Sequence, residues 1–260
     1  MRLLRVIAAV MLAIIVAPHV MANDIPVNER RSGATFMAPE TQAMQADDTA
    51  NPGILGVIDG EALWNSKLGA ADKSCASCHT ESRTSMNGVA ARYPAFDETL
   101  KRPVDLEQRV NLCRVNNQQA PPLTPDSREM LALTALIGRQ SRGMAIGGGN
   151  DPRLAPFVEK GREIFTRRQG QLNLGCVNCH DDNWDKRLVG SAITQGHPTG
   201  YPVYRLEWQG LGSLQRRLRN CMVGMRAQPF EPDGPEAVAL ELFLMSRARG
   251  MLVETPAVRP

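Results

Sequence analysis

The sequence predicts a mainly α-helical protein in which two related units stand in tandem behind an extended N-terminal arm. Three observations support this fold. The chain aligns with itself over four blocks, both copies contain the same five-residue cysteine and histidine motif, and an apolar segment with helical spacing closes each copy. About 238 residues remain after an N-terminal export signal, which is enough for two domains of about 100 to 120 residues.

Residues 1–22 have the features of a signal peptide. Arg2 and Arg5 precede an apolar stretch from Val6 to Ala17, and small residues lead up to a cleavage site after Ala22. Without this segment the formal charge falls from +3 to +1, so the composition gives no indication of nucleic-acid binding. No later stretch approaches the roughly 20 apolar residues of a membrane-spanning helix.

Two Cys-x-x-Cys-His motifs are the strongest chemical signal in the chain. In this motif two thiols add to the vinyl groups of a porphyrin while the adjoining histidine binds the iron. A single copy is also compatible with a zinc or redox pair, but two copies at matching repeat positions favour haem. The sequence therefore predicts two covalently bound haem c groups, attached through Cys75, Cys78, Cys176 and Cys179 and bound by His79 and His180.

The internal repeat supplies the order of elements. The matched blocks are 60–64 with 161–165, 93–94 with 201–202, 106–113 with 214–221, and 131–143 with 238–250. The offset is 101 residues at the first block and at the cysteine motif, and 107 or 108 at the later blocks. Each unit thus has a helix, a haem motif, a long loop, a short helix ending in Cys and a closing helix, which is the order of a class I cytochrome c.

We predict four regions from this pattern: a signal peptide (1–22), an N-terminal arm (23–58), a first cytochrome c-like domain (59–146) and a second one (147–260). The boundary is placed at the glycine-rich stretch 147–152. Gly143 and Gly250 are expected to cap the closing helices. The arm has no counterpart in the second unit, so it either packs on the body or on a partner, or is disordered.

The second axial ligand of each iron has several candidates. His197 is the one histidine left over and is expected in a surface loop, while Met86, Met222 and Met225 also remain candidates. Two spare cysteines, Cys113 and Cys221, ordinarily predict a disulfide in an exported protein. Their equivalent positions, 34 and 41 residues beyond their own haem histidines, instead favour one thiolate ligand for each iron.

The whole mature chain resembles one family, the dihaem A subunits of SoxAX cytochromes, which start the oxidation of sulfur compounds in bacteria. The resemblance rests on the two haem motifs, on Cys113 and on the run Arg-Arg-Leu-Arg-Asn-Cys-Met at 216–222. It implies L-cysteine S-thiosulfotransferase activity in the periplasm. Thiosulfate is joined to a cysteine of the SoxYZ carrier protein, and two electrons pass to a cytochrome c acceptor.

The resemblance also implies a heterodimer with a small monohaem cytochrome, the X subunit, and roles for individual residues. Cys113 would be the distal ligand of the first haem. Cys221 would be the distal ligand of the second haem and the active-site cysteine, found as a persulfide. Arg217 corresponds to an active-site arginine.

The residues around Cys221 suit this assignment. Thiosulfate is a small dianion, and the forked donors of arginine bind such oxyanions well. Arg217 precedes Cys221 by four residues and shares its face if the segment is helical, with Arg216, Arg219 and Arg226 nearby. The alternatives are a solvated arginine face, a plain dihaem electron-transfer cytochrome in which both cysteines are only ligands, and a dihaem peroxidase, for which the sequence offers no catalytic residues.

Overall fold

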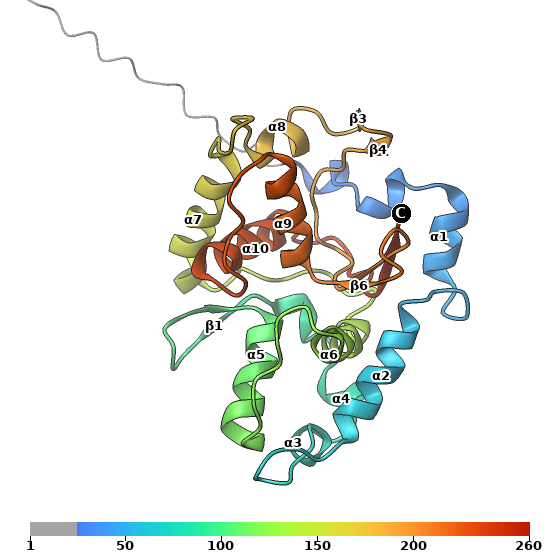
Figure 1. The fold of residues 1–260 in the computed structure, drawn as a ribbon, viewed down its shortest axis with the longest axis vertical. Helices are drawn as coiled ribbons and strands as arrows, with labels where there is room; N and C mark the ends of the chain where they lie inside the picture. Colours follow the sequence, from blue (N-terminus) through green and yellow to red (C-terminus); the bar gives the residue numbers. More distant parts are fainter. Residues whose placement is uncertain (1–24) are drawn as a thin grey trace, which may run out of the picture.

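The computed structural model describes residues 25–260, so the predicted signal peptide lies outside the described part of the chain. The fold is mainly helical, as predicted, and Figure 1 shows the two units one above the other. The first unit consists of α2 (Ile54–Asn65), α3 (Ala76–His79), α4 (Ser82–Ser85), η3 (Ala90–Arg92), β1 (Ala95–Asp97), β2 (Arg102–Val104), α5 (Leu106–Cys113), the π-helical turn η4 (Arg114–Gln118) and α6 (Arg128–Arg139).

The second unit keeps the main helices and the strand pair in this order, lacks counterparts of α4, η3 and η4, and adds a short 3-10 turn at its start, one hairpin and a C-terminal strand. It consists of η5 (Pro152–Leu154), α7 (Ala155–Thr166), α8 (Cys176–His180), β3 (Arg187–Leu188), β4 (Ser191–Ala192), β5 (Val203–Arg205), β6 (Gly210–Gly212), α9 (Leu214–Gly224), α10 (Pro235–Arg247) and β7 (Ala257–Arg259). The β3–β4 hairpin lies in the stretch where the repeat offset rises from 101 to 108. The inserted residues therefore form a local hairpin between α8 and β5.

The internal repeat is visible in the packing of the two long helix pairs. Helices α2 and α6 pack together in the first unit, as α7 and α10 do in the second. A Cβ atom at Gly60 would lie 2.3 Å from the carbonyl oxygen of Ala132, and one at Gly161 would lie 2.1 Å from that of Ala239. Both helix pairs are thus in backbone contact at equivalent points, which explains a glycine at each crossing.

The two short antiparallel strand pairs also match residue by residue. In the first unit Ala95 pairs with Val104 and Asp97 with Arg102. In the second, Val203 pairs with Gly212 and Arg205 with Gly210, each at an offset of 108. The strand pair before the cysteine-bearing helix is therefore built in the same register in both units.

The C-terminal segment ties the two units together. Beyond α10 the backbone N–H groups of Gly143 and Ile146 donate to the carbonyl oxygens of Val253 and Met251, both at 2.8 Å. Strand β7 then runs parallel to β5 in the second unit. Ile146 is buried, and Gly147 donates to Ala91 at 2.9 Å, so the predicted boundary is packed against the body rather than loose.

The N-terminal arm packs on the body, and it is not wholly extended, because it contains η1 (Val27–Glu29), η2 (Gly33–Phe36) and α1 (Pro39–Ala46). Figure 1 shows it in blue, passing from the second unit to the first. Asp48 pairs with Arg139 at 2.6 Å and Arg142 at 2.7 Å, and Asn51 donates to the carbonyl of Pro256 at 2.9 Å. These contacts, rather than a periodic apolar pattern, hold the arm in place, so its helices could not be predicted from periodicity.

Two expectations about helix ends were wrong in detail. Helix α6 ends at Arg139 and α10 at Arg247, and Gly143 and Gly250 instead take positive φ angles of 80° and 83° in the turns that follow. Glycine is needed for these left-handed turns, not for a helix cap. Helix α9 continues past Cys221 to Gly224.

Buried carboxyl groups gather where the two units meet. Gln215 donates to Asp105 at 2.7 Å, and Gln108 donates to the carbonyl of Asp233 at 2.8 Å, so hydrogen bonds cross between the units here. Burial, with the charges of Asp105 and Asp233 added, raises the pKa of Glu107 to about 8. Folding thus favours the protonated form of this carboxyl group.

A raised carboxyl pKa makes stability fall as the pH rises, because the folded state holds a proton that the unfolded state has released. We expect the Glu107→Gln protein to match the wild type near pH 4 and to be more stable at pH 8, since the amide cannot ionise. Urea unfolding at the two pH values tests this. Equal loss of stability between pH 4 and pH 8 in both proteins would contradict it.

Candidate haem sites

The first cysteine motif lies on α3, at the lower end of the molecule in Figure 1. Cys78 and His79 are exposed, and Cys75 and Cys113 are half-buried. The ring of Trp64 lies 5.8 Å from that of His79, and the Trp64 indole N–H donates to the carbonyl of Thr80 at 3.0 Å. Tryptophan thus anchors the end of α3 to α2.

Helix α5 brings Cys113 close to the same motif. Asp105 caps this helix by accepting from the N–H of Gln108 at 2.7 Å, in a reciprocal capping box. Burial raises the pKa of the Cys113 thiol, Arg109 opposes this, and the neighbouring Cys78 adds to it. The three thiols of the first unit therefore lie together, as the repeat argument predicts.

The second motif lies on α8, and its histidine is oriented by the backbone. The Nδ1 atom of His180 forms a 2.7 Å hydrogen bond with the carbonyl of Thr194, which leaves Nε2 available for a metal. Burial by itself raises the pKa of the Cys221 thiol, but a hydrogen bond with His180 and the charge of Arg217 lower it below the usual value. Cys221 and His180 thus lie close together, so both side chains could hold the iron of a haem.

The residues present fit a haem c in each unit. Each unit offers two thiols for attachment, a histidine, and a cysteine from another helix as the second axial donor. The surroundings are apolar: Cys75 packs with Trp64, Leu136 and Val110, and Cys176 packs with a cluster that contains Phe165, Leu218 and Phe230. All six thiols are free, so Cys113 and Cys221 do not form the disulfide that was one alternative.

His197 differs from the expectation of a surface histidine. It is 8% exposed, neither ring nitrogen has a hydrogen-bond partner among residues 25–260, and burial lowers its pKa to about 3. The loop that contains His197 is held in place by hydrogen bonds. The carbonyl of Thr194 accepts one from His180, and the side chain of Gln195 forms two with the arm backbone, at Arg31 and Glu29. The burial of His197 thus depends on long-range contacts with the arm, which the local sequence does not predict.

The three candidate methionines are core residues in this structure. Met86 packs with Trp64 in the first unit, whereas Met222 and Met225 form a separate apolar cluster with Ala227. They fill space between helices, as methionine commonly does.

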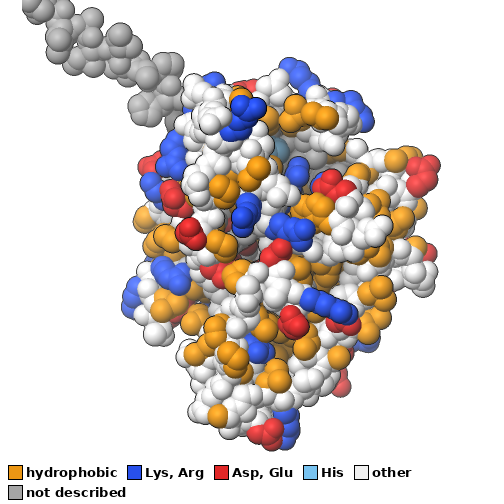
Figure 2. Space-filling view, viewed as in Figure 1, with side chains coloured by type: hydrophobic (Ala, Val, Ile, Leu, Met, Phe, Trp, Pro, Cys, Tyr) orange, Lys and Arg blue, Asp and Glu red, His pale blue; other side chains and the backbone are white. Residues whose placement is uncertain are grey.

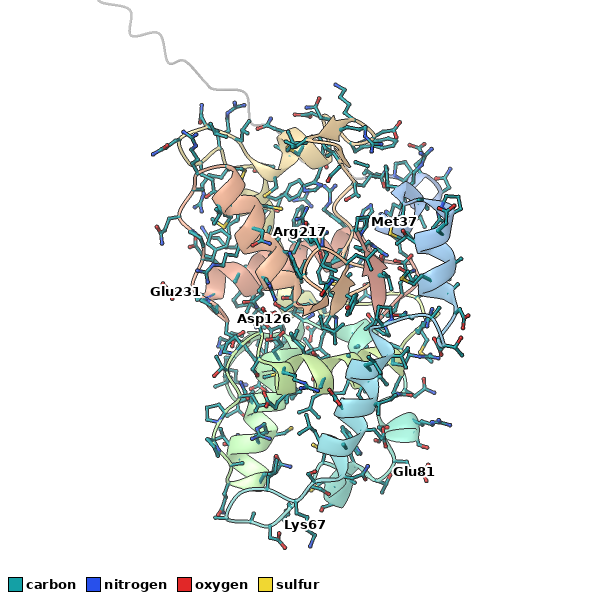
Figure 3. All side chains as sticks on the ribbon, turned by 45° about the vertical axis from the view of Figure 1, so that its right-hand side comes forward. Met37, Lys67, Glu81, Asp126, Arg217 and Glu231 are labelled. Carbon is teal, nitrogen blue, oxygen red and sulfur yellow. The ribbon has the colours of Figure 1, made fainter. Side chains whose placement is uncertain are left out.

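The arginines near Cys221 divide into two groups. Arg217 affects Cys221 and the half-buried Tyr201 through its charge, which places all three side chains together. Figure 3 shows Arg217 on α9, and in Figure 2 basic side chains gather over the same region. Three arginines that the sequence suggested as neighbours of Cys221 make other contacts: Arg216, Arg219 and Arg226. The sequence analysis did not identify Arg205, whose charge acts on both Cys221 and Tyr201.

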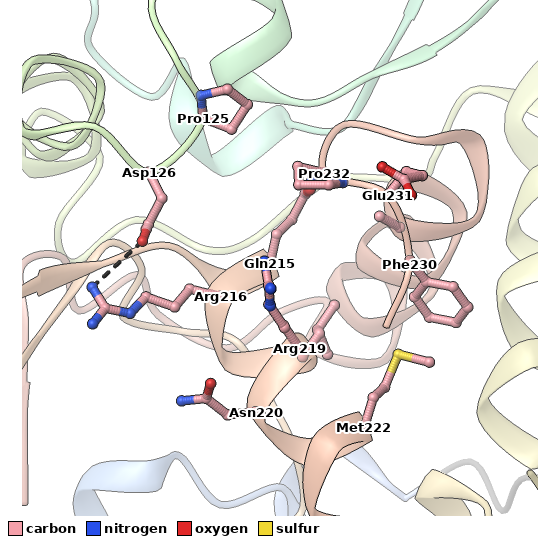
Figure 4. Close-up of a pocket in the computed structure, with 12 residues that line it drawn as sticks. Pro125, Asp126, Gln215, Arg216, Arg219, Asn220, Met222, Phe230, Glu231 and Pro232 are labelled. Carbon is pink, nitrogen blue, oxygen red and sulfur yellow. Dashed lines mark hydrogen bonds and ion pairs between the residues drawn. The ribbon is translucent and has the colours of Figure 1, made fainter. Parts of the chain in front are cut away.

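A cavity of about 420 Å³ lies beside α9 and is separate from the thiol site. Figure 4 shows Arg216 reaching Asp126 of the first unit, and the two atoms of this ion pair are 3.4 Å apart. Arg219, Phe230 and Met222 also line the cavity, whereas Cys221 and Arg217 do not. The helix thus presents Arg216 and Arg219 to the cavity and Arg217 to the cysteine.

A buried ion pair connects the end of α8 to α10. Arg247 donates to Asp181, the residue after His180, at 2.6 Å and 3.3 Å, and the two side chains are 4% and 2% exposed. The guanidinium also stacks over the rings of Phe165 and Phe243, at 4.6 Å and 5.8 Å from their centroids. The pair therefore links the haem motif to α10 and the core.

Replacing Cys113 by Met is expected to keep the first haem attached, because the thioether bonds use Cys75 and Cys78. The ferric low-spin absorption spectrum should change, since a thioether would replace a thiolate at the iron. Absorption and electron paramagnetic resonance spectra of the two proteins test this. An unchanged spectrum, or isolation of a peptide with Cys113 and Cys221 in disulfide linkage, would contradict the assignment.

The repeated helical fold and its paired cysteine and histidine sites define a c-type cytochrome, and the comparisons with known proteins agree. A family model described as SoxA/TsdA, cytochrome c domain, matches residues 59–146 and again residues 160–253. The cofactor is therefore haem c. Among residues 25–260 no helix is long and apolar enough to cross a membrane.

Curated relatives and a solved structure narrow the class. The L-cysteine S-thiosulfotransferase subunit SoxA of Pseudaminobacter salicylatoxidans is 41% identical over 90% of this chain and 82% of its own length. The same subunit of Rhodovulum sulfidophilum is 38% identical over 89% and 81%. A chain in the crystal structure of SoxXA from P. pantotrophus superposes with a TM-score of 0.86 and 35% identity, over 89% of this chain and 87% of that one. The chain belongs to the SoxA family.

Proposed function

We propose that this protein is the SoxA subunit of an L-cysteine S-thiosulfotransferase, that it carries two haem c groups, and that Cys221 is its reactive cysteine. The observation that carries the proposal is the placement of Cys221 beside both His180 and Arg217. Family membership supports the activity, because the curated relatives are named as SoxA subunits of L-cysteine S-thiosulfotransferase. Cys113 lacks this setting, because its neighbouring arginine, Arg109, is paired with Asp97.

The reaction joins two sulfur atoms. The sulfane sulfur of thiosulfate forms a bond with the cysteine sulfur of the carrier, the carrier thiol releases its proton, and two electrons leave. Haem c, when bound, supplies one-electron redox chemistry for their transfer to a cytochrome c acceptor. SoxYZ is the proposed carrier.

The residues of this chain hold the reactants in place. The Arg217 guanidinium binds the sulfonate end, because its forked donors match the oxyanion. The sulfane sulfur is then directed to the persulfide of Cys221, and an S–S bond forms between them as the two electrons leave. A carrier thiolate attacks the sulfane sulfur, takes over the intact S–SO3 group and leaves the Cys221 persulfide behind. The Thr194 carbonyl fixes the His180 ring by its hydrogen bond to Nδ1.

The proposed assembly is a heterodimer with a SoxX-type monohaem cytochrome in the periplasm. A structural neighbour is a SoxXA complex, which supports this partner. The predicted signal peptide, with cleavage after Ala22, is consistent with export. The alternative of a plain dihaem electron carrier requires no arginine beside Cys221.

Substitution of Arg217 tests the proposed function. Arg217→Ala should lower thiosulfate turnover by about a hundredfold, because a charge-assisted pair of hydrogen bonds to the sulfonate is lost. Arg217→Lys keeps the charge without the fork and should be intermediate. Turnover is measured with the purified heterodimer, SoxYZ and a cytochrome c acceptor, with Arg219→Ala from the other side of α9 as the control. Full activity of Arg217→Ala would make the arginine a surface residue.

A further inference from the structure

Three side chains accompany each spare cysteine, and one of the three differs between the units. The first unit has Tyr93, Asp97, Arg109 and Cys113, and the second has Tyr201, Arg205, Arg217 and Cys221, all at an offset of 108. The tyrosine, the later arginine and the cysteine are the same in both. At the remaining position a carboxylate in the first unit is replaced by a guanidinium in the second.

In the first unit the carboxylate neutralises the arginine. Arg109 donates to Asp97 at 2.6 Å, and the Asp97 side chain is only 8% exposed. The other carboxylate oxygen of Asp97 accepts from the N–H groups of Thr99 and Leu100, at 2.9 Å and 2.7 Å. Arg109 is therefore held by a fixed internal anion, and no anion from solution is needed beside Cys113.

In the second unit Arg205 stands where that carboxylate would be. Arg205 pairs with Gly210 across the strands, as Asp97 pairs with Arg102, so both side chains start from the same point of the same scaffold. A residue at this point can reach the helical arginine, as the Asp97–Arg109 pair shows. Among residues 25–260, no carboxylate forms an ion pair with Arg217.

Arg205 also has donors to spare. Its Nε and Nη2 atoms donate to Glu207 at 3.1 Å and 2.5 Å, and its guanidinium lies 5.3 Å from the ring centroid of Trp208. The side chains of Arg205 and Glu207 are 17% and 52% exposed, so the carboxylate of this pair is open to solvent, which weakens the pair. The Nη1 donors are not used by Glu207, and the ring of Trp208 limits the movement of the guanidinium plane.

Two arginines on neighbouring elements repel each other unless an anion lies between them. We infer that Arg205 is a second anion-binding residue beside Cys221, which holds the sulfonate of thiosulfate together with Arg217. The exchange of Asp97 for Arg205 between the units then explains why one cysteine site accepts a dianion and the other does not. This inference rests on the proposed function and adds a residue to that site.

The test compares substitutions that change the charge at position 205. Arg205→Gln should raise the KM for thiosulfate about tenfold or more, with a smaller effect on kcat, because a charge-assisted hydrogen bond to the bound anion is lost. Arg205→Lys should recover part of this loss. Arg205→Asp should raise KM about a hundredfold or more, since it recreates the internal ion pair of the first unit. Arg83→Gln, which removes an exposed charge from the first unit, is the control and should match the wild type.

The outcomes separate this inference from the proposed function. A wild-type heterodimer that does not conjugate thiosulfate to SoxYZ overturns the proposed function itself. If the wild type is active and Arg205→Gln has the wild-type KM, Arg205 does not bind the anion and the inference is wrong. Haem content and absorption spectra of each variant identify a misfolded protein. If Arg205→Gln is misfolded, the wild type and Arg205→Lys are compared for inhibition by sulfate, a dianion that competes with thiosulfate. Stronger inhibition of the wild type supports the inference, and equal inhibition overturns it.

Discussion

Replacing Cys221 by Met is expected to reduce electron release from thiosulfate by several orders of magnitude while both haems stay attached. The thioether bonds of the second haem use Cys176 and Cys179, so attachment does not need Cys221. A methionine sulfur still can ligate iron, but it cannot hold a sulfane sulfur or exchange with a thiolate. Turnover with SoxYZ and a cytochrome c acceptor, together with intact mass for haem content, measures both effects.

Cys113→Met is the matched control, because it changes the equivalent residue of the other unit. This variant should keep most of its activity, since the Asp97–Arg109 pair leaves no free cation beside Cys113. Peptide mass spectrometry of the wild type should find about 32 Da added at Cys221 and none at Cys113, as expected for a persulfide. If Cys221→Met conjugates thiosulfate at the wild-type rate, the plain electron carrier becomes the better interpretation.

Breaking the buried ion pair behind α8 should have the largest effect on stability. In Arg247→Leu the carboxylate of Asp181 would be left without its bidentate partner at 2% exposure, which typically costs about 3–5 kcal/mol of the free energy of unfolding. Because Asp181 follows His180 directly, the second haem spectrum should also change. Guanidinium unfolding of the haem-loaded protein measures the loss.

Arg249→Leu is a suitable control, because Arg249 is exposed and follows the same helix. Its effect should stay within about 0.5 kcal/mol of the wild type. A double variant, Arg247→Leu with Asp181→Leu, should be more stable than Arg247→Leu alone, since no buried charge remains unpaired. Equal unfolding midpoints for wild type and Arg247→Leu would show that the pair contributes nothing.

The sequence determined the features that are local or repeated. The Cys-x-x-Cys-His motifs need only five adjacent residues, and the helical face shared by Arg217 and Cys221 follows from a spacing of four. The repeat placed Cys113 and Cys221 at equivalent points, and α5, α9 and the two strand pairs occupy those equivalent points in the structure. These inferences succeed because the distances involved are fixed by the backbone geometry of single elements.

Only the tertiary structure decided what approaches those elements from elsewhere in the chain. His197 is buried because the arm at Glu29 and Arg31 holds its loop, and Arg247 reaches Asp181 across 66 residues of sequence. Arg205 joins the Cys221 site because a strand pair brings it beside α9, whereas Arg216 is drawn away to Asp126. Such contacts depend on the packing of separate elements, so charge along the sequence cannot show which arginines lie beside Cys221 and which do not.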